Sequence, residues 1–508
     1  MRLNGCASIL SVVLFLSVLA LYQAVPVVRS DQIDSALAIL DDSGKVAAFQ
    51  LPLIRKEAPE RREAVVKNAR KVTRAVYSAT LTTDEEIAWG VPINLGSSTG
   101  IIVTVDSGSS DLYVSGPLCT SSSLGCTTGS AYVESGSFGD IPCPSTICSE
   151  STQTACHSLG GNQVCAVTTC YGAGGLSGVV STDLFGMNGI PNKATVTFGN
   201  LFDASGDQCT YPGEVFTPQW AGIMGVAFGS IAEMPGFNAT ALDKLIAANN
   251  LTNAFSLCVL PTNAFMSIGS DYSCNTDFVY TNIVNDAYYQ VTITDMGTDG
   301  TSFGLTQAQL NQVVANAPTI VDSGTTELIL NSASSSALNS ALNKLCSDGA
   351  GLVGYCGILA NETIFAGFCY AMQTSDIQAY PSVYVTIGGA TITLQGSDWV
   401  LPGRGCPSGY YASGINWFSN APTILGDTFM RTQHVVFDKK NNRIGFGPTS
   451  TCNLPAATCS RKLSTILTSC LSLFADLLFC WQPTLRLRLA ATAAVVARAT
   501  QLPACPPL

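Results

Sequence analysis

Histidine is nearly missing from this sequence: its 508 residues include only His157 and His434. A mixed cysteine–histidine zinc site needs histidines beside closely spaced cysteines, and none of the close cysteine pairs here has one. Neither histidine lies near a recognisable nucleophile turn, which argues against a serine hydrolase. A zinc site built from cysteines alone stays open as an alternative, because spacing by itself does not exclude it.

Positive charge is scarce in the body of the chain. Residues 81–452 contain 8 Lys and Arg against 27 Asp and Glu. Nucleic-acid binding needs Lys and Arg to neutralise phosphates, so the sequence predicts no nucleic-acid partner. Such an acidic surface suits an acidic working environment, where protonation of carboxylates relieves their mutual repulsion. Only 12% of all residues are charged and 47% are hydrophobic, which excludes a disordered chain and predicts a globular one.

The apolar run near the N-terminus is short. Residues 9–21 are almost entirely apolar and follow Arg2. The run is too short to span a membrane comfortably, and it has the length of a secretory signal core. We therefore interpret residues 1–30 as a signal peptide and exclude them from the fold.

Cysteine, in contrast, is abundant: the chain has 20, of which 16 lie between Cys119 and Cys459. An even group of cysteines in an exported chain favours disulfides, because oxidising compartments preserve them. Glycosylation sequons at Asn238, Asn250 and Asn361 also suit the secretory route. The sequence thus predicts a secreted, disulfide-bonded glycoprotein.

A basic segment separates the predicted signal peptide from the body. Residues 54–74 hold 8 Lys and Arg against Glu57, Glu60 and Glu63. Near neutral pH such a segment would be held against the acidic body by charge, and protonation of the body's carboxylates would release it. We interpret residues 31–80 as a detachable basic propeptide. An exposed polar helix or a linker is the alternative.

The body has the pattern of a mainly β protein. Short runs rich in Val, Ile, Thr and aromatic residues are separated by Gly, Ser, Asn and Pro. The clearest predicted strands are residues 100–105, 194–198, 289–294 and 383–387. Helical patterns are few, and the clearest are residues 241–248 and 336–345.

The body carries the same pair of signatures twice. In the first half an apolar run leads into Asp106-Ser-Gly-Ser109, and Ile223-Met-Gly225 follows. In the second half an apolar run leads into Asp322-Ser-Gly-Thr325, and Ile424-Leu-Gly426 follows. Internal similarity of this kind indicates a duplicated architecture, so we expect two similar lobes that each present one aspartate.

These signatures define the expected domains. We expect an N-terminal lobe over residues 81–275 and a C-terminal lobe over residues 276–452, followed by an extension over residues 453–508. Residues 463–481 of the extension are mostly apolar but include Asp476, so neither a membrane orientation nor a span is well specified. A membrane anchor and a removed extension are both open alternatives.

The two repeated aspartates suggest an acid–base pair. A glycine two places on lets the chain turn sharply, and small hydroxyl residues can hydrogen-bond the loop and hold the carboxylate still. If the lobes face each other, repulsion between two carboxylates about 3 Å apart is on the order of 5 kcal/mol, so Asp106 and Asp322 share one proton. The ionised member can then take a proton from a bound water while the protonated member polarises a carbonyl, without a metal or other cofactor. Alternatively, Asp106 and Asp322 are structural turn residues whose side chains hydrogen-bond their own backbone.

At these residues the chain resembles the pepsin family of aspartic proteases, over roughly residues 87–452. Residues 106–114 and 322–326 resemble the family's two active-site loops, and residues 171–178 resemble its flap hairpin. Residues 423–446 are similar to the closing segment, which is the most specific stretch. The resemblance implies a bilobal, double-β-barrel fold with few short helices. It also implies an aspartic endopeptidase, made as a zymogen, that cuts peptide bonds at acid pH.

The same resemblance implies roles for the active-site loops. Ser109 and Thr325 would hydrogen-bond the catalytic carboxylates. Ser107 and Ser323 would brace the two loops against each other. Tyr171 would close over the substrate.

The resemblance also implies a substrate pocket and partners. Trp220 and Ile223 would line the main specificity pocket, although each has an ordinary core role as its alternative. The implied partners are protein or peptide substrates and the chain's own propeptide as inhibitor, with membrane contact only if the extension anchors the protein. The implied location is the secretory pathway, with an extracellular or an acidic vacuolar or lysosomal destination.

Cysteine spacing refines the resemblance. The insertion from Cys119 to Cys170 is similar to that of nepenthesin-type plant members, and its pairing is undetermined. Cys369 with Cys406 resembles the family's bridge in the second lobe. The chain departs from the family at two positions. Tyr113 stands where the family usually has Trp, which alters how the flap tyrosine is held. Ala221 replaces a common Asp.

A non-catalytic member of the same fold, acting as an inhibitor or binding protein, is the main rival interpretation. Such proteins tend to lose a catalytic aspartate or the flap tyrosine. This chain keeps Asp106, Asp322 and Tyr171, so we expect an enzyme.

Overall fold

The computed structural model describes four stretches of the chain. These are residues 37–40, 46–52, 54–55 and 89–453, the last without residues 120–131, 150–152, 172–173, 205–208, 210–219, 235–237, 261–263, 271, 274, 315, 403–405 and 419–420. The predicted signal peptide, most of the predicted propeptide and the extension beyond Asn453 lie outside the described residues. No helix within the described stretches is long and apolar enough to cross a membrane.

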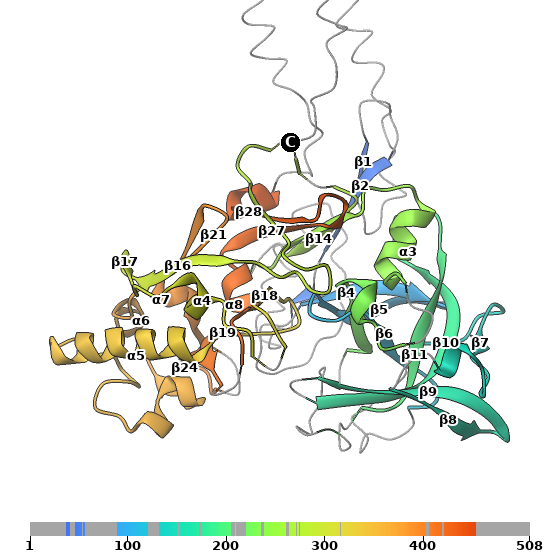
Figure 1. Cartoon of the computed structure of the whole chain (residues 1–508), viewed down its shortest axis with the longest axis horizontal. Coiled ribbons are helices and arrows are strands. Elements are labelled where there is room, and N and C mark those ends of the chain that lie inside the picture. The colour runs from blue at the N-terminus through green and yellow to red at the C-terminus, as the bar shows by residue number, and fades with distance from the viewer. Residues whose placement is uncertain are drawn as a thin grey trace, which may run out of the picture. The chain divides into compact units, whose positions relative to one another are not determined.

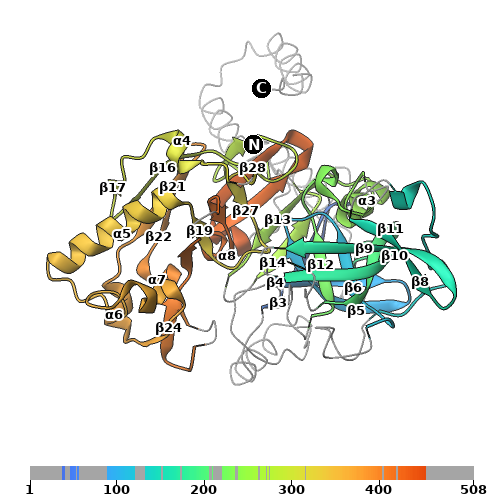
Figure 2. The same ribbon diagram turned by 60° about the horizontal axis from the view of Figure 1, so that its bottom comes forward.

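The first half of the body forms a ten-stranded sheet (Figure 1). Its strand order is β3-β4-β5-β12-β6-β11-β10-β9-β8, and β7 pairs with β10. The strands are β3 (Ile54–Arg55), β4 (Trp89–Leu95), β5 (Ser98–Asp106), β6 (Leu112–Ser115), β7 (Gly139–Asp140), β8 (Thr154–Leu159), β9 (Asn162–Tyr171), β10 (Gly174–Gly186), β11 (Ala194–Asp203) and β12 (Gly222–Gly225). Figure 2 shows β8, β9 and β10 as adjacent strands.

The second half forms three smaller sheets, with strand orders β17-β16-β21-β22, β18-β26-β19-β25 and β20-β24-β23. Their strands are β16 (Ile293–Thr298), β17 (Thr301–Ser302), β18 (Ile320–Val321), β19 (Leu328–Leu330), β20 (Tyr370–Ala371), β21 (Val383–Ile387), β22 (Ala390–Leu394), β23 (Val400–Pro402), β24 (Tyr410–Ser413), β25 (Ile415–Trp417) and β26 (Ile424–Leu425). The prediction of a mainly β protein is confirmed.

A seven-stranded sheet combines strands from distant parts of the sequence, in the order β1-β2-β14-β13-β27-β28-β15. Its strands are β1 (Leu37–Leu40), β2 (Val46–Pro52), β13 (Ala254–Cys258), β14 (Phe265–Ile268), β15 (Val279–Asn282), β27 (Gln433–Asp438) and β28 (Arg443–Pro448). β1, β2 and β3 all lie within the predicted propeptide range, so that segment contributes backbone pairing to two of the sheets.

Short helices complete the described fold. They are α3 (Ala241–Ala248), α4 (Gln307–Leu310), α5 (Ser332–Ser347), α6 (Thr374–Gln378), α7 (Gly396–Trp399) and α8 (Asp427–Met430), with 3-10 turns η2 (Ile147–Ser149), η3 (Gly229–Ile231), η4 (Ala360–Glu362), η5 (Ile364–Ala366), η6 (Lys439–Asn441) and η7 (Thr449–Asn453). The predicted helix over residues 241–248 is confirmed as α3. A capping box between Thr240 and Asp243 explains where α3 begins.

Two of the other predicted elements differ in extent. The predicted helix over residues 336–345 is longer, because the Asn331 side chain caps α5 four residues earlier by accepting from the Ser334 N–H. The predicted strand over residues 289–294 is wrong in its first part, since β16 begins at Ile293. Tyr289 instead lies buried in the core, where its hydroxyl donates to the Val226 carbonyl at 2.8 Å.

The repeated signatures correspond to a repeated strand arrangement. β12 runs parallel to β5 and antiparallel to β6. β26 likewise runs parallel to β18 and antiparallel to β19. Each half therefore places the strand of its second signature beside the strand that leads into its aspartate.

Disulfides join several of these elements. The described pairs are Cys143–Cys156, Cys148–Cys165, Cys170–Cys209, Cys258–Cys452, Cys346–Cys356 and Cys369–Cys406. The pairing expected for Cys369 with Cys406 is confirmed. The first three pairs lie in or beside the cysteine-rich insertion, and Cys170–Cys209 fixes the end of β9.

Candidate active site

Asp106 ends β5, and its carboxylate is held by its own loop. The side chain is buried. The Gly108 N–H donates to Asp106 Oδ1 at 2.8 Å, and the Ser109 hydroxyl donates to Oδ2. Both donors stabilise the charged form and fix the direction in which the carboxylate points.

Asp322 follows β18 and has the same surroundings. It is also buried. The Gly324 N–H donates to Asp322 Oδ1 at 2.9 Å, and the Thr325 hydroxyl donates to Oδ2 at 2.6 Å. The two loops are thus equivalent, residue for residue.

Ser107 and Ser323 connect the loops reciprocally. The Ser107 N–H donates to Ser323 Oγ at 3.1 Å, and the Ser323 N–H donates to Ser107 Oγ at 2.9 Å. The Ser107 hydroxyl donates to the Val321 carbonyl at 3.1 Å, and the Ser323 hydroxyl donates to the Val105 carbonyl at 2.8 Å. Four hydrogen bonds between buried groups therefore set the position of one aspartate relative to the other.

The glycines of the two loops allow the carboxylates to approach. A Cβ on Gly108 would lie 2.6 Å from Asp322 Oδ1, and one on Gly324 would lie 2.3 Å from Asp106 Oδ1. Each glycine therefore lies directly against the opposite carboxyl group. Any larger residue at either position would push the pair apart.

The pair cannot carry two full charges. Burial raises the pKa of Asp106 well above its ordinary value, and the negative charge of Asp322 raises it further. Interaction with the Asp322 side chain also raises the pKa of Asp106, and each carboxyl lies against the glycine of the opposite loop. The arrangement can hold one proton and present one acid and one base to a bound reactant.

Asp427 adds a third carboxyl, to which the sequence analysis gave no role. It is the first residue of α8 and is buried, and its N–H donates to the Thr325 carbonyl at 2.8 Å. Burial and the nearby charge of Asp322 raise its pKa well above the ordinary value, although the Arg431 cation opposes this. Its position directly after Ile424-Leu-Gly426 is the sequence feature that could have indicated a place near the site.

The β9–β10 hairpin brings Tyr171 to the site. Tyr171 is the last residue of β9 and pairs with Gly174 of β10. Burial raises the pKa of Tyr171 well above the ordinary value, the nearby charge of Asp106 raises it further, and an interaction with Ser109 lowers it. The hairpin therefore places an aromatic hydroxyl beside the Asp106 loop.

Tyr113, one of the departures from the family pattern, contacts the same hairpin. Its side chain is fully buried, and its hydroxyl hydrogen-bonds Thr169 Oγ1 of β9 at 2.6 Å. The other departure, Ala221, is buried in the sheet, where its N–H donates to the Ile102 carbonyl at 2.8 Å. Of the two, only Tyr113 touches the hairpin that carries Tyr171.

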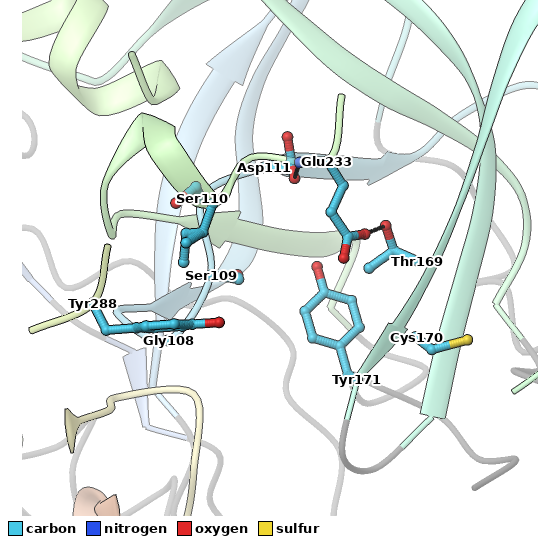
Figure 3. Close-up of a pocket in the computed structure, with 10 residues that line it drawn as sticks. Gly108, Ser109, Ser110, Asp111, Thr169, Cys170, Tyr171, Glu233 and Tyr288 are labelled. Atoms are coloured by element: carbon cyan, nitrogen blue, oxygen red, sulfur yellow. Dashed lines mark hydrogen bonds between the residues drawn. The ribbon is translucent and has the colours of Figure 1, made fainter. Parts of the chain in front are cut away.

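A pocket of about 240 Å³ opens beside the Asp106 loop (Figure 3). It is lined by Gly108, Ser109, Ser110, Asp111, Thr169, Cys170, Tyr171, Ile231, Glu233 and Tyr288. Trp220 and Ile223, expected to line the main specificity pocket, are both buried and do not line this one. Ile223 packs in a cluster against which Tyr171 rests.

A possible metal-ligand cluster lies apart from the pocket. The ligand atoms of Cys258, His434 and Cys452 lie within 4.8 Å of one another. Cys258 and Cys452 form a disulfide, however, and a disulfide sulfur is not the thiolate that binds a metal. Both ring nitrogens of His434 hydrogen-bond hydroxyls, those of Thr451 and Ser256. The cluster is therefore accounted for by structural contacts.

Comparison with known proteins agrees with this geometry. A family model described as eukaryotic aspartyl protease matches residues 88–449. Cathepsin D of Chionodraco hamatus is 28% identical over 293 residues, which cover 54% of this chain and 64% of that protein. Pepsin A of Rhinolophus ferrumequinum is 26% identical over 355 residues, covering 68% of this chain and 77% of that protein.

Gastricsin of Mus musculus is a further relative, 25% identical over 374 residues that cover 72% of this chain and 80% of that protein. The family match extends over both aspartate loops, the flap hairpin and the closing segment. The chain therefore belongs to the eukaryotic aspartyl protease family, the aspartic-type endopeptidases.

Proposed function

We propose that the protein is made as a secreted zymogen and hydrolyses peptide bonds in proteins at acid pH, with Asp106 and Asp322 as its catalytic residues. One observation carries the proposal: two buried carboxyls, one from each half of the body, face each other across two glycines. Ser109 and Thr325 support the carboxylates, and Ser107 and Ser323 keep the loops in register.

The chemistry follows from the shared proton. A water between the carboxyls loses a proton to the ionised member as its oxygen attacks the carbonyl carbon of the scissile peptide. The protonated member donates to the carbonyl oxygen and stabilises the charge that develops there. The carboxyl that took the proton from water then passes it to the amide nitrogen, and the diol intermediate returns one hydroxyl proton to the other carboxylate as the C–N bond breaks. The products are a carboxylic acid and an amine, and the pair again holds one proton. Burial of Asp106 favours the protonated form of that carboxyl before substrate binds.

Substrate binding involves the flap hairpin in this proposal. Tyr171 closes over a bound peptide segment, and the pocket beside it accepts a side chain of that segment. Ile223 shapes the cleft from beneath, because it packs in the cluster that Tyr171 rests on. Trp220 is buried beside Gly90 of β4 and supports the cleft from the core. The substrates are accordingly unfolded or extended segments of proteins.

Activation and location rest on charge and processing signals. The basic segment before the body and the acidic body attract each other near neutral pH, and acid weakens that attraction. The sequon residues Asn238, Asn250 and Asn361 are all exposed, which permits glycosylation during export. We propose secretion or delivery to an acidic compartment, with the basic segment acting as an inhibitor until acid releases it.

The test is digestion of haemoglobin by the acid-treated precursor between pH 2 and pH 7. Asp106→Asn and Asp322→Asn should each lower the rate by about 100- to 10,000-fold, the range for loss of a general acid or base. Asp277→Asn is the matched control, because that aspartate is exposed. A statine-type inhibitor should block the wild type.

Persistent activity of Asp322→Asn would contradict the mechanism. A wild-type protein that binds peptides yet cleaves none at any pH in this range would instead support the non-catalytic alternative.

A further inference from the structure

The pocket beside the dyad contains two carboxyls that the proposed mechanism does not use. Asp111 lies on the loop between Asp106 and β6, and Glu233 lies just after η3. Both line the pocket together with Gly108 and Ser109 of the Asp106 loop. A substrate side chain in this pocket would therefore belong to a residue close to the scissile bond.

Asp111 positions Glu233. The Asp111 carboxylate is buried and accepts hydrogen bonds from the backbone N–H of Glu233 at 2.7 Å and of Met234 at 3.3 Å. These bonds satisfy Asp111 locally and fix the backbone from which the Glu233 side chain extends. Asp111 is thus a positioning residue, and Glu233 is the carboxyl that remains to meet a ligand.

Thr169 of β9 orients the Glu233 carboxyl. The Thr169 hydroxyl donates to Glu233 Oε2. Because that hydroxyl has one proton, the hydroxyl of Tyr113, 2.6 Å away, must be the donor to Thr169. Figure 3 shows Glu233 beside Thr169, with the Tyr171 hydroxyl directed toward it. Thr169 thereby holds one oxygen of Glu233, while the residue still lines the pocket.

The titratable groups around Glu233 are all acids, and among the described residues no cation compensates the charge that they acquire on ionisation. Burial raises the pKa of Glu233 and raises that of Asp111 to about 7, and no positively charged side chain of the described residues contributes to either shift. The titratable groups that face Glu233 are Asp111, Tyr113, Tyr171 and Tyr288, with the Asp106–Asp322 pair nearby. All of these groups are acids, so a cation entering the pocket meets only negative or neutral neighbours.

The walls also suit a long cationic side chain. Tyr288 and Tyr171 stand on opposite sides of the pocket (Figure 3), and tyrosine rings attract ammonium and guanidinium groups. A volume of about 240 Å³ is below the range of about 300–1,000 Å³ that is usual for whole drug-sized ligands, so the pocket fits a single side chain.

We propose that this pocket selects a lysine or arginine side chain of the substrate near the scissile bond, with the Glu233 carboxylate as its ion-pair partner. This specificity rests on the proposed peptidase function. Glu233 must ionise to act, and burial raises its pKa above the ordinary 4.5, so the preference for a basic residue should increase as the pH rises above about 4.5. Asp111, with a pKa of about 7, stays mostly protonated up to about pH 6.

The test uses quenched fluorescent peptides that carry Lys, Arg, Gln or Met at one of the three positions on either side of the scissile bond. At one position, Lys and Arg should raise kcat/KM at pH 5.5 by about 10- to 100-fold over Gln and Met, as expected for a hydrogen bond to a charged group. In Glu233→Gln this preference should shrink to about threefold or less, mainly through KM, because the lost contact binds substrate and transition state alike.

Controls separate charge from folding. Glu362→Gln removes an equal charge from an exposed residue of η4 and should keep the preference. Glu233→Ala should lose it as Glu233→Gln does, so the test survives if one of the two variants fails to fold. Calorimetric affinities of the same peptides, with the scissile amide reduced, give a readout that does not depend on cleavage.

The outcomes are distinguishable. Cleavage by the wild type without any preference for Lys or Arg, or a preference that both Glu233 variants retain, overturns the specificity and leaves the peptidase function standing. No cleavage, with tighter binding of the Lys and Arg peptides that the variants lose, overturns the peptidase function and supports the cation pocket.

Discussion

Single residues set the pH behaviour of this protein through burial. Asp106, Asp111 and Asp427 are buried, and burial is the largest cause of the raised pKa of each. Burial acts in the opposite direction on a base, and it lowers the pKa of His434 to about 3. The buried acids therefore favour the folded state at acid pH, and His434 opposes them.

The Asp111→Asn variant tests how one buried acid changes the pH dependence of stability. The folded-state pKa of Asp111 is about 7 against an ordinary 3.8, so the folded state binds more protons than the unfolded state between these values. The contribution of Asp111 to stability therefore falls as the pH rises from about 4 to 7, by about 4 kcal/mol in total. Asn cannot ionise but can still accept the Glu233 N–H, so the variant should lose less stability over this range than the wild type.

Urea unfolding of both proteins at pH 4 and pH 7 measures the difference. Asp277→Asn, at an exposed position, should follow the wild type. An Asp111→Asn protein with the same pH dependence as the wild type would show that Asp111 is ionised in the folded protein well below pH 7.

Among the elements, the β9–β10 hairpin lies beside the pocket next to Asp106. β9 carries both Tyr171, beside the Asp106 loop, and Thr169, which contacts Tyr113 and Glu233. Cys170 lies between these two residues and forms a disulfide with Cys209. The hairpin is therefore held near its turn by a disulfide and by a row of hydroxyl contacts, in addition to its strand pairing in the sheet.

Tyr113→Phe removes one of these contacts and keeps the ring. Loss of a buried hydrogen bond costs about 1 kcal/mol, which should raise KM about fivefold because the closed hairpin is less populated before substrate binds. The change in kcat should be smaller. Tyr370→Phe removes a tyrosine hydroxyl bonded to the Glu362 carbonyl at 2.6 Å, outside this hairpin, and is the matched control. Equal KM values for wild type and Tyr113→Phe would mean that Tyr113 does not hold the hairpin.

In the whole molecule, the duplication explains both what the sequence could predict and what it could not. The two Asp-Ser-Gly signatures predicted a β scaffold with an aspartate in each half, because each signature follows a strand and combines a turn glycine with a hydroxyl. Local spacing was sufficient for α3 and β21 as well. These features depend on neighbours in the sequence.

Features that depend on tertiary packing were not predictable. Glu233 contacts Thr169 across 64 residues, and no local pattern marks that pairing. Tyr289 looked like part of a strand, but its ring packs with Phe255 and Phe437 in the core. The pairing of residues 46–52 with β14 likewise joins segments that share no motif.

The pH dependence of kcat/KM on a single peptide, with the lobes' two aspartates intact, tests the central claim most directly. A pair that works with one shared proton should give a bell-shaped profile with its maximum at acid pH. Activity falls on the acid side when both carboxyls are protonated and on the alkaline side when both are ionised. A rate that rises steadily to neutral pH and stays there would contradict the account.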